Sequence, residues 1–185
     1  GMRKSELERI FSELKAVLVP LVRSISERLD RVDDTVLRRR YPEAAQWSLG
    51  LEAARRLGYD FQRGRQDKSV HPFTTSFSVN DVRITTRVDE QFLPTALFGT
   101  LHECGHALYE QGIHQDLERS PLAAGASLGV HESQSRLWEN LVGRSRSFWK
   151  FFFPQRREAF PQNLHGVSLE SFYRSINRVE PSLIR

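Results

Sequence analysis

The residues with the clearest chemical potential form a short run, His102-Glu103-Cys104-Gly105-His106, which has the HExxH spacing. On a helix, side chains four positions apart lie on one face, with Cβ atoms about 5–6 Å apart. Two imidazoles at that spacing can both reach one Zn²⁺ ion at about 2.0–2.1 Å. Glu103 is rotated by about 100° around the helix axis. Its carboxylate can therefore lie beside the metal and take a proton from a water molecule that the metal has made more acidic.

A catalytic zinc ion needs a third protein ligand and one open position. Residues after the motif that carry suitable donor atoms are His114, Glu118, His131, Glu132, Glu139 and His165. Glu132 begins the next strongly helical stretch, which suits a second helix packed beside the first. Spacing alone gives Glu132 only a small lead over His131, which could instead cap that helix. Glu139 shares a helical face with Glu132, so one of the two could bind the metal while the other orients a histidine.

The HExxH motif alone also arises by chance, as two surface histidines on an ordinary helix. Its apolar flanks, including Phe98, Leu101 and Leu108, indicate a buried helix instead. Small Gly105 would let another element approach this helix closely. Together with a downstream third ligand, these features favour a metal site.

The elements expected to position these residues are mostly helical. A capping box at Ser5 and Glu8, followed by apolar residues at helical spacing, predicts a long amphipathic helix that ends near Asp30. Residues 59–72 lack periodicity and are expected to form a loop, whereas residues 73–88 predict two antiparallel strands around a tight turn. Further helices are predicted after residue 33, from 42 to 58, from 94 to 112, from 131 to 146, and from 168 to before 181. The chain is therefore expected to be mainly α, with one small β-hairpin.

Composition narrows the class of protein. The chain has 185 residues and a net charge of +4, from 27 basic and 23 acidic residues. The densest basic cluster, residues 38–40, is better explained as a solvated helix end than as a nucleic-acid site. The single cysteine, Cys104, excludes an internal disulfide and favours a reducing compartment. We recognise no signal peptide and no apolar stretch long enough to span a membrane, so we expect a cytoplasmic protein without membrane or nucleic-acid partners.

A wider resemblance rests on several stretches of the chain. They are His71-Pro72-Phe73-Thr74, Asp81-Val82-Arg83-Ile84-Thr85, the HExxH motif with its continuation Ala107-Leu108-Tyr109-Glu110-Gln111-Gly112, and His131-Glu132-Ser133-Gln134-Ser135-Arg136-Leu137-Trp138-Glu139-Asn140. In order and approximate spacing they resemble the carboxypeptidase Taq family of zinc-dependent carboxypeptidases. The resemblance implies a helical, zincin-like metallopeptidase domain, commonly a homodimer. It also implies release of single residues from peptide substrates with a free C-terminus.

The resemblance implies roles for particular residues. His102 and His106 would bind zinc, with Co²⁺ as an alternative metal, Glu132 would be the third ligand, and Glu103 the general base. His71 and Arg83 belong to motifs that look like parts of the substrate cleft, although Arg83 could equally hold the hairpin together. Arg185 is the candidate partner of the substrate's terminal carboxylate, because an arginine fork matches a carboxylate. Glu139 is expected to orient a metal-bound histidine.

The chain departs from the family in length. Family members extend further at both ends, so residues 2–185 are expected to form a single catalytic-core domain of a longer chain, with Gly1 left by tag removal. The leading hypothesis is a zinc metallocarboxypeptidase; the alternatives are a catalytically impaired metal-binding remnant and, third, a metalloendopeptidase. Without the missing segments, the apolar stripe of Phe11, Leu14 and Leu18 is expected to face outward and to drive self-association.

Overall fold

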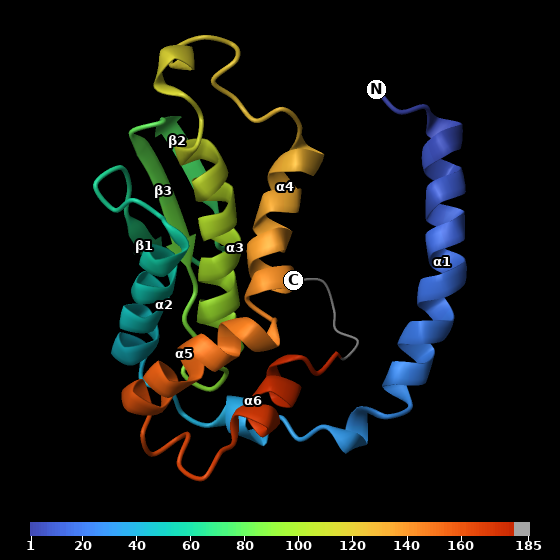
Figure 1. Cartoon of the computed structure of the whole chain (residues 1–185), viewed down its shortest axis with the longest axis vertical. Coiled ribbons are helices and arrows are strands. Elements are labelled where there is room, and N and C mark those ends of the chain that lie inside the picture. The colour runs from blue at the N-terminus through green and yellow to red at the C-terminus, as the bar shows by residue number, and fades with distance from the viewer. Residues whose placement is uncertain (180–185) are drawn as a thin grey trace.

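The computed structural model describes residues 1–179. It is mostly helical, with a small sheet, and helix α1 stands apart from the body formed by the other elements (Figure 1). In chain order the elements are α1 (Lys4–Ser26), η1 (Leu29–Arg31), η2 (Thr35–Arg38), α2 (Glu43–Leu57), β1 (Gln66–Lys68), β2 (Thr74–Ser78), β3 (Asp81–Thr86), α3 (Pro94–Gln111), η3 (Gln115–Leu117), α4 (Leu128–Arg136), η4 (Leu137–Val142), α5 (Arg146–Ala159) and α6 (Leu169–Ile176). The expected mainly α class is confirmed.

Within residues 1–179 the sheet has three strands, in the order β1-β3-β2. The predicted hairpin is confirmed as the antiparallel pair β2–β3, with an irregularity between Ser76 and Ser78. The prediction of a loop over residues 59–72 is wrong in part, because β1 lies in it and pairs in parallel with β3, Gln66 opposite Ile84. A strand of only three residues carries no alternating pattern, so its conformation depends on a partner that is distant in sequence.

Two helix starts differ from the prediction. The capping box at Ser5 and Glu8 does not occur, since α1 begins after Arg3 without a side-chain cap. Helix α4 begins before His131, because the side chain of Ser127 accepts a hydrogen bond from the backbone N–H of Val130 and caps it. Ser127 lies in a stretch of Gly, Ala and Ser residues, where a cap is hard to distinguish from a loop serine.

Helix α3 is the centre of the body and contacts α2, α4, η4, β2 and β3. One end packs into an aromatic core with α5 and α6, in which Leu101 and Trp149 are fully buried. The other end packs through Cys104 and Ala107 against β3, where Ile84 is also fully buried. Because burial of a large apolar side chain contributes about 1.5–3 kcal/mol, α3 is held firmly on several sides.

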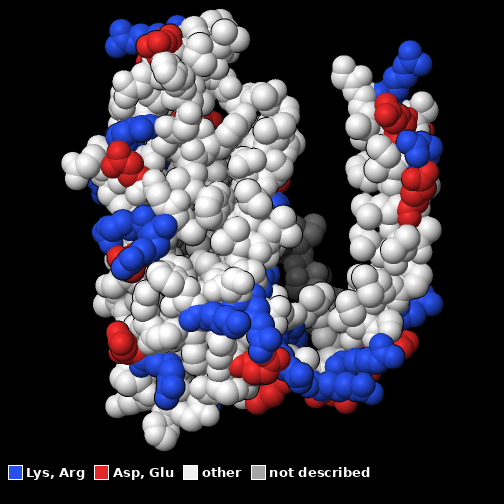
Figure 2. All heavy atoms as spheres, viewed as in Figure 1, with Lys and Arg blue, Asp and Glu red and all other residues white. Residues whose placement is uncertain are grey.

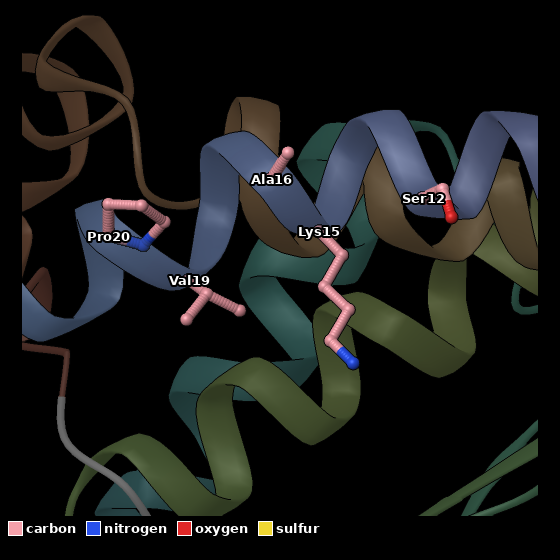
Figure 3. A pocket seen from close by; sticks show the side chains of 5 residues that line it. All are labelled: Ser12, Lys15, Ala16, Val19 and Pro20. Atoms are coloured by element: carbon pink, nitrogen blue, oxygen red, sulfur yellow. The ribbon is translucent and has the colours of Figure 1, made fainter.

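Helix α1 has no buried residue. The predicted outward-facing stripe is confirmed, since Phe11, Leu14 and Leu18 are 61%, 48% and 42% exposed. A shallow depression of about 400 Å³ lies along this helix, lined by Ser12, Lys15, Ala16, Val19 and Pro20 (Figure 3). Lys15 is the only charged residue that lines it, so the depression has no group of side chains suited to catalysis or metal binding.

Basic and acidic side chains are interspersed over the face shown in Figure 2. In the basic cluster at residues 38–40, Arg38 pairs with Asp34 at 2.9 Å and Arg40 with Glu90 at 3.2 Å. Arg39 donates a hydrogen bond to the carbonyl of Asn163. Among the described residues, no helix is both long and apolar enough to cross a membrane.

Candidate metal centre

The candidate site lies where α3 and α4 cross, and Gly105 allows the crossing. A Cβ atom at Gly105 would lie only 2.6 Å from Cα of Ser135 and 2.7 Å from the carbonyl oxygen of Gln134. Carbon atoms in ordinary contact are about 3.5–4.0 Å apart, so no other residue fits without moving the helices. The predicted close approach at Gly105 is confirmed, and it brings Glu132 of α4 over the histidines of α3.

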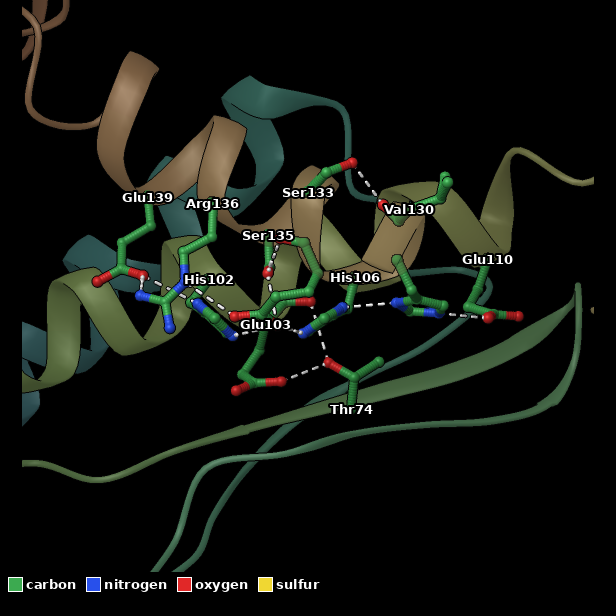
Figure 4. Close-up of polar contacts among 12 residues, drawn as sticks. Thr74, His102, Glu103, His106, Glu110, Val130, Ser133, Ser135, Arg136 and Glu139 are labelled. Atoms are coloured by element: carbon green, nitrogen blue, oxygen red, sulfur yellow. Dashed lines mark hydrogen bonds and ion pairs between the residues drawn. The ribbon is translucent and has the colours of Figure 1, made fainter. Parts of the chain in front are cut away.

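His102, His106 and Glu132 offer donor atoms that all lie within 4.8 Å of one another. Oε2 of Glu132 is 3.6 Å from Nε2 of His102 and 3.4 Å from Nε2 of His106. In a tetrahedral site with bonds of about 2.0–2.1 Å, neighbouring donors are about 3.3 Å apart. Glu132 therefore lies at the distance from both histidines that a shared divalent metal ion requires. His102 and His106 project from the same side of α3 (Figure 4).

Glu139 lies behind His102. Its Oε2 atom is 2.9 Å from Nδ1 of His102 and 3.1 Å from Nη1 of Arg136 (Figure 4). Glu139 is almost fully buried, with 2% of its side chain exposed. Since an ionised carboxylate can only accept, Nδ1–H of His102 donates to it, and Nε2 is the ring nitrogen that faces Glu132.

The carboxylate of Glu103 is buried between α3 and β2. The hydroxyl of Thr74 lies 2.7 Å from Oε2 of Glu103 and 3.0 Å from its backbone carbonyl (Figure 4). Burial raises the pKa of Glu103 above its ordinary value, and the Thr74 hydrogen bond and the charge of His102 offset only part of that rise. Thr74 was not singled out as a site residue from the sequence, although it stands in the stretch that follows His71.

The charge states at the site suit metal binding. Burial, followed by the neighbouring imidazoles of His102 and His131, lowers the pKa of His106 to about 4, so its ring is neutral near pH 7. Burial raises the pKa of Glu132, but Arg136 and His102 outweigh that effect and leave the pKa below its ordinary value. A neutral imidazole and an ionised carboxylate are the forms that bind a divalent metal.

His131, the close rival of Glu132 in the sequence, lies on the other side of His106. Its Nδ1 atom is 2.6 Å from Nδ1 of His106, the ring nitrogen that faces away from Glu132. The alternative role of His131 as a helix cap is wrong, because Ser127 caps α4. The other donor candidates are placed elsewhere: His114 and Glu118 accept hydrogen bonds from the backbone N–H groups of Asp116 and Val79, and His165 is exposed.

The predicted substrate-binding residues have different positions. His71 is exposed in the segment before β2, and its charge is among those that lower the pKa of Glu103. Arg83 donates two hydrogen bonds, of 2.8 and 2.7 Å, to Asp81. This contact within the hairpin is the structural role given above as the alternative to substrate binding. Arg185 lies outside the described residues. Substrate contact by His71, Arg83 or Arg185 stays a prediction.

A helix pair that carries HExxH, with a glutamate donor on the second helix, defines a metallopeptidase-type site. The family model described as carboxypeptidase Taq (M32) metallopeptidase matches residues 1–185. The chain belongs to this family.

Individual relatives agree with that assignment. Thermostable carboxypeptidase 1 of Thermus thermophilus is 51% identical over the whole chain, and carboxypeptidase 1 of Bacillus subtilis is 43% identical. The crystal structure of the M32 carboxypeptidase from Deinococcus radiodurans superposes on the whole chain with a TM-score of 0.93 at 48% identity. The chain spans only 36–37% of the length of these proteins.

Proposed function

We propose that this chain is the zinc-binding catalytic core of a metallocarboxypeptidase, in which His102, His106 and Glu132 bind the metal and Glu103 is the general base. The observation that carries the proposal is the convergence of the three donor atoms within 4.8 Å of one another. The carboxylate of Glu103, the residue after His102 on α3, is buried beside them. Zn²⁺ is the preferred metal because two imidazoles and one carboxylate are one of the ligand sets found at catalytic zinc sites. Co²⁺ would be the natural substitute in experiments.

When bound, zinc supplies a Lewis acid that acidifies a water molecule and polarises the scissile carbonyl. Glu103 accepts the proton of the attacking water and then delivers it to the leaving amine. Thr74 holds one carboxylate oxygen of Glu103 at 2.7 Å, which fixes the direction in which the base acts. The raised pKa of Glu103 supports this role, since a base exchanges protons best when its pKa approaches the working pH.

The proposed substrates are peptides with a free C-terminus, shortened by one residue at a time. The support is the family membership and the relatives named carboxypeptidases. The chain has a single cysteine, which suits the cytoplasm. The exposed stripe on α1 supports self-association, and we propose a homodimer.

Replacement of Glu103 by Gln tests the mechanism. The variant should bind zinc as the parent chain does and lose turnover, because glutamine cannot accept the proton. Glu170→Gln on the exposed surface of α6 is the matched control and should behave as the parent. Normal peptide hydrolysis by the Glu103→Gln variant would refute the role of Glu103 as the general base.

The type of peptidase is tested with pairs of peptides that differ only in C-terminal amidation. Cleavage confined to the free acids supports a carboxypeptidase. Internal cleavage of the amidated peptides would instead establish an endopeptidase. Stable zinc binding without cleavage of either would identify a metal-binding remnant of the family.

A further inference from the structure

A second hydrogen-bonded chain approaches the candidate metal centre from the side opposite Glu139. It runs from Glu110 to His131 and on to His106. Oε1 of Glu110 is 2.6 Å from Nε2 of His131, and Nδ1 of His131 is 2.6 Å from Nδ1 of His106. Glu110 and His106 lie one turn apart on α3, and Figure 4 shows both on the same side of that helix.

The hydrogen bonds define where the protons lie. The carboxylate of Glu110 can only accept, so Nε2–H of His131 donates to it. In a neutral imidazole the other nitrogen is then an acceptor, and Nδ1 of His131 receives the Nδ1–H of His106. The opposite arrangement would leave a bare ring nitrogen against the carboxylate. Nε2 of His106 is thereby left without a proton, and it faces Oε2 of Glu132 at 3.4 Å.

The ring of His131 is held in a close-fitting slot. The ring of Tyr109 packs against it edge-on at 5.1 Å. A Cβ atom at Gly125 would lie 2.9 Å from Cδ2 of His131. The side chains of His131 and Glu110 are only 23% and 14% exposed, so water competes weakly for their hydrogen bonds.

We propose that His131 is a positioning residue, held by Glu110, that orients His106 and fixes its tautomer for metal binding without being a ligand itself. This inference rests on the proposed metal site. Both ring nitrogens of His131 are engaged, and His131 is not part of the cluster of three donors. His102 has the carboxylate of Glu139 directly behind it. His106 instead has the imidazole of His131 behind it, and the carboxylate of Glu110 lies beyond that ring.

This arrangement has an electrostatic reason. Glu132 and the buried Glu103 already bring two carboxylates to the site. A carboxylate in place of His131 would add a further negative charge beside them. A neutral imidazole supplies the same hydrogen-bond acceptor without that charge, and Glu110 still selects its tautomer.

Zinc affinity of three variants, measured by competition with a chromophoric chelator, tests the proposal. His131→Leu removes the acceptor and should weaken zinc binding about 10–100-fold. His131→Asn places an amide oxygen close to the former Nδ1 position, so it should restore much of the lost affinity. His114→Leu, at a histidine whose side chain is 73% exposed, is the matched control and should bind zinc as the parent does.

A role in packing alone predicts the reverse order, because leucine fills the slot better than asparagine. Higher zinc affinity in His131→Leu than in His131→Asn would therefore overturn the proposal. Glu110→Gln should weaken binding in the parent background and have little effect when combined with His131→Leu, since Glu110 acts through His131. Additive losses would also overturn it.

The visible spectrum of the Co²⁺-loaded protein distinguishes a positioning residue from a ligand. With His131 as a positioning residue, saturated His131→Leu should keep the band positions and intensities of the parent, because the ligand set is unchanged. An altered Co²⁺ spectrum in His131→Leu would indicate that His131 is a metal ligand. Tight metal binding by a Glu132→Gln variant would indicate the same. If the parent chain binds neither metal, the proposed function itself fails. If the parent chain binds zinc and His131→Leu binds it with the same affinity, only the positioning role of His131 is refuted.

Discussion

Replacement of Gly105 by alanine tests the idea that the α3–α4 crossing sets the geometry of the metal site. The added Cβ atom would lie 2.6 Å from Cα of Ser135 and 2.7 Å from the carbonyl oxygen of Gln134. Both are backbone atoms of α4, so no flexible side chain can move aside. To restore ordinary contact, the two helices must separate by about 1 Å.

That separation is large for a metal site. Oε2 of Glu132 lies 3.4 Å and 3.6 Å from the two histidine nitrogens, and metal–ligand distances tolerate deviations of about 0.2 Å. We expect zinc affinity to fall at least tenfold, which corresponds to about 1.4 kcal/mol. Overpacking should lower the free energy of unfolding of the metal-free protein by about 1–3 kcal/mol, even though alanine favours helices over glycine by about 1 kcal/mol.

Urea denaturation of the metal-free protein and a zinc competition titration measure the two effects. Gly129→Ala on α4 is the matched control, because its Cβ atom would meet only Oγ of Ser127, at 3.9 Å. This control should keep its zinc affinity and unfold at an equal or higher urea concentration. A Gly105→Ala variant that matched the control in both measurements would refute the idea that this contact spaces the helices.

Three further predictions concern metal, thiol and surface. With free zinc at about 100 times the dissociation constant, binding stabilises the folded protein by about 2.7 kcal/mol. Removal of zinc by a chelator should therefore lower Tm by roughly 5–10 °C in calorimetry. An unchanged Tm would show that the folded protein does not bind zinc at this strength. Cys104 is fully buried, and burial raises its pKa to about 12. Its alkylation by iodoacetamide should thus be slow in the native protein and fast in urea. Equal alkylation rates in the two conditions would contradict the burial of Cys104. Phe11→Glu combined with Leu18→Glu should reduce self-association seen by light scattering, unless the stripe on α1 plays no part in it.

The proposed metal-binding face of α3 could be predicted from the sequence, because helical periodicity alone places His102 and His106 together. The choice between His131 and Glu132 could not be made in the same way. Adjacent helical residues point about 100° apart, so the outcome depends on how α4 is rotated against α3. The contact at Gly105 sets that rotation. The glycine indicates from the sequence that another element comes close, but not that the backbone of Gln134 and Ser135 meets it.

Other parts of the site come from segments whose local pattern is weak. Thr74 reaches Glu103 from the start of β2, and its role depends on how the sheet packs against α3. Strand β1 is defined by its pairing with β3 rather than by its own residues. Ser127 is an ordinary helix cap, but the glycine and alanine residues before it resemble a featureless connection.

The proposed ligands and the residues that hold them lie within a short stretch of the chain, from His102 to Glu139. A single connection, residues 112–127, joins the two helices. The entropy of loop closure grows only slowly with loop length, and contacts that are local in sequence form quickly during folding. If the proposed site binds zinc while the chain folds, the binding free energy of the metal can therefore be gained before the aromatic core of α5 and α6 is complete.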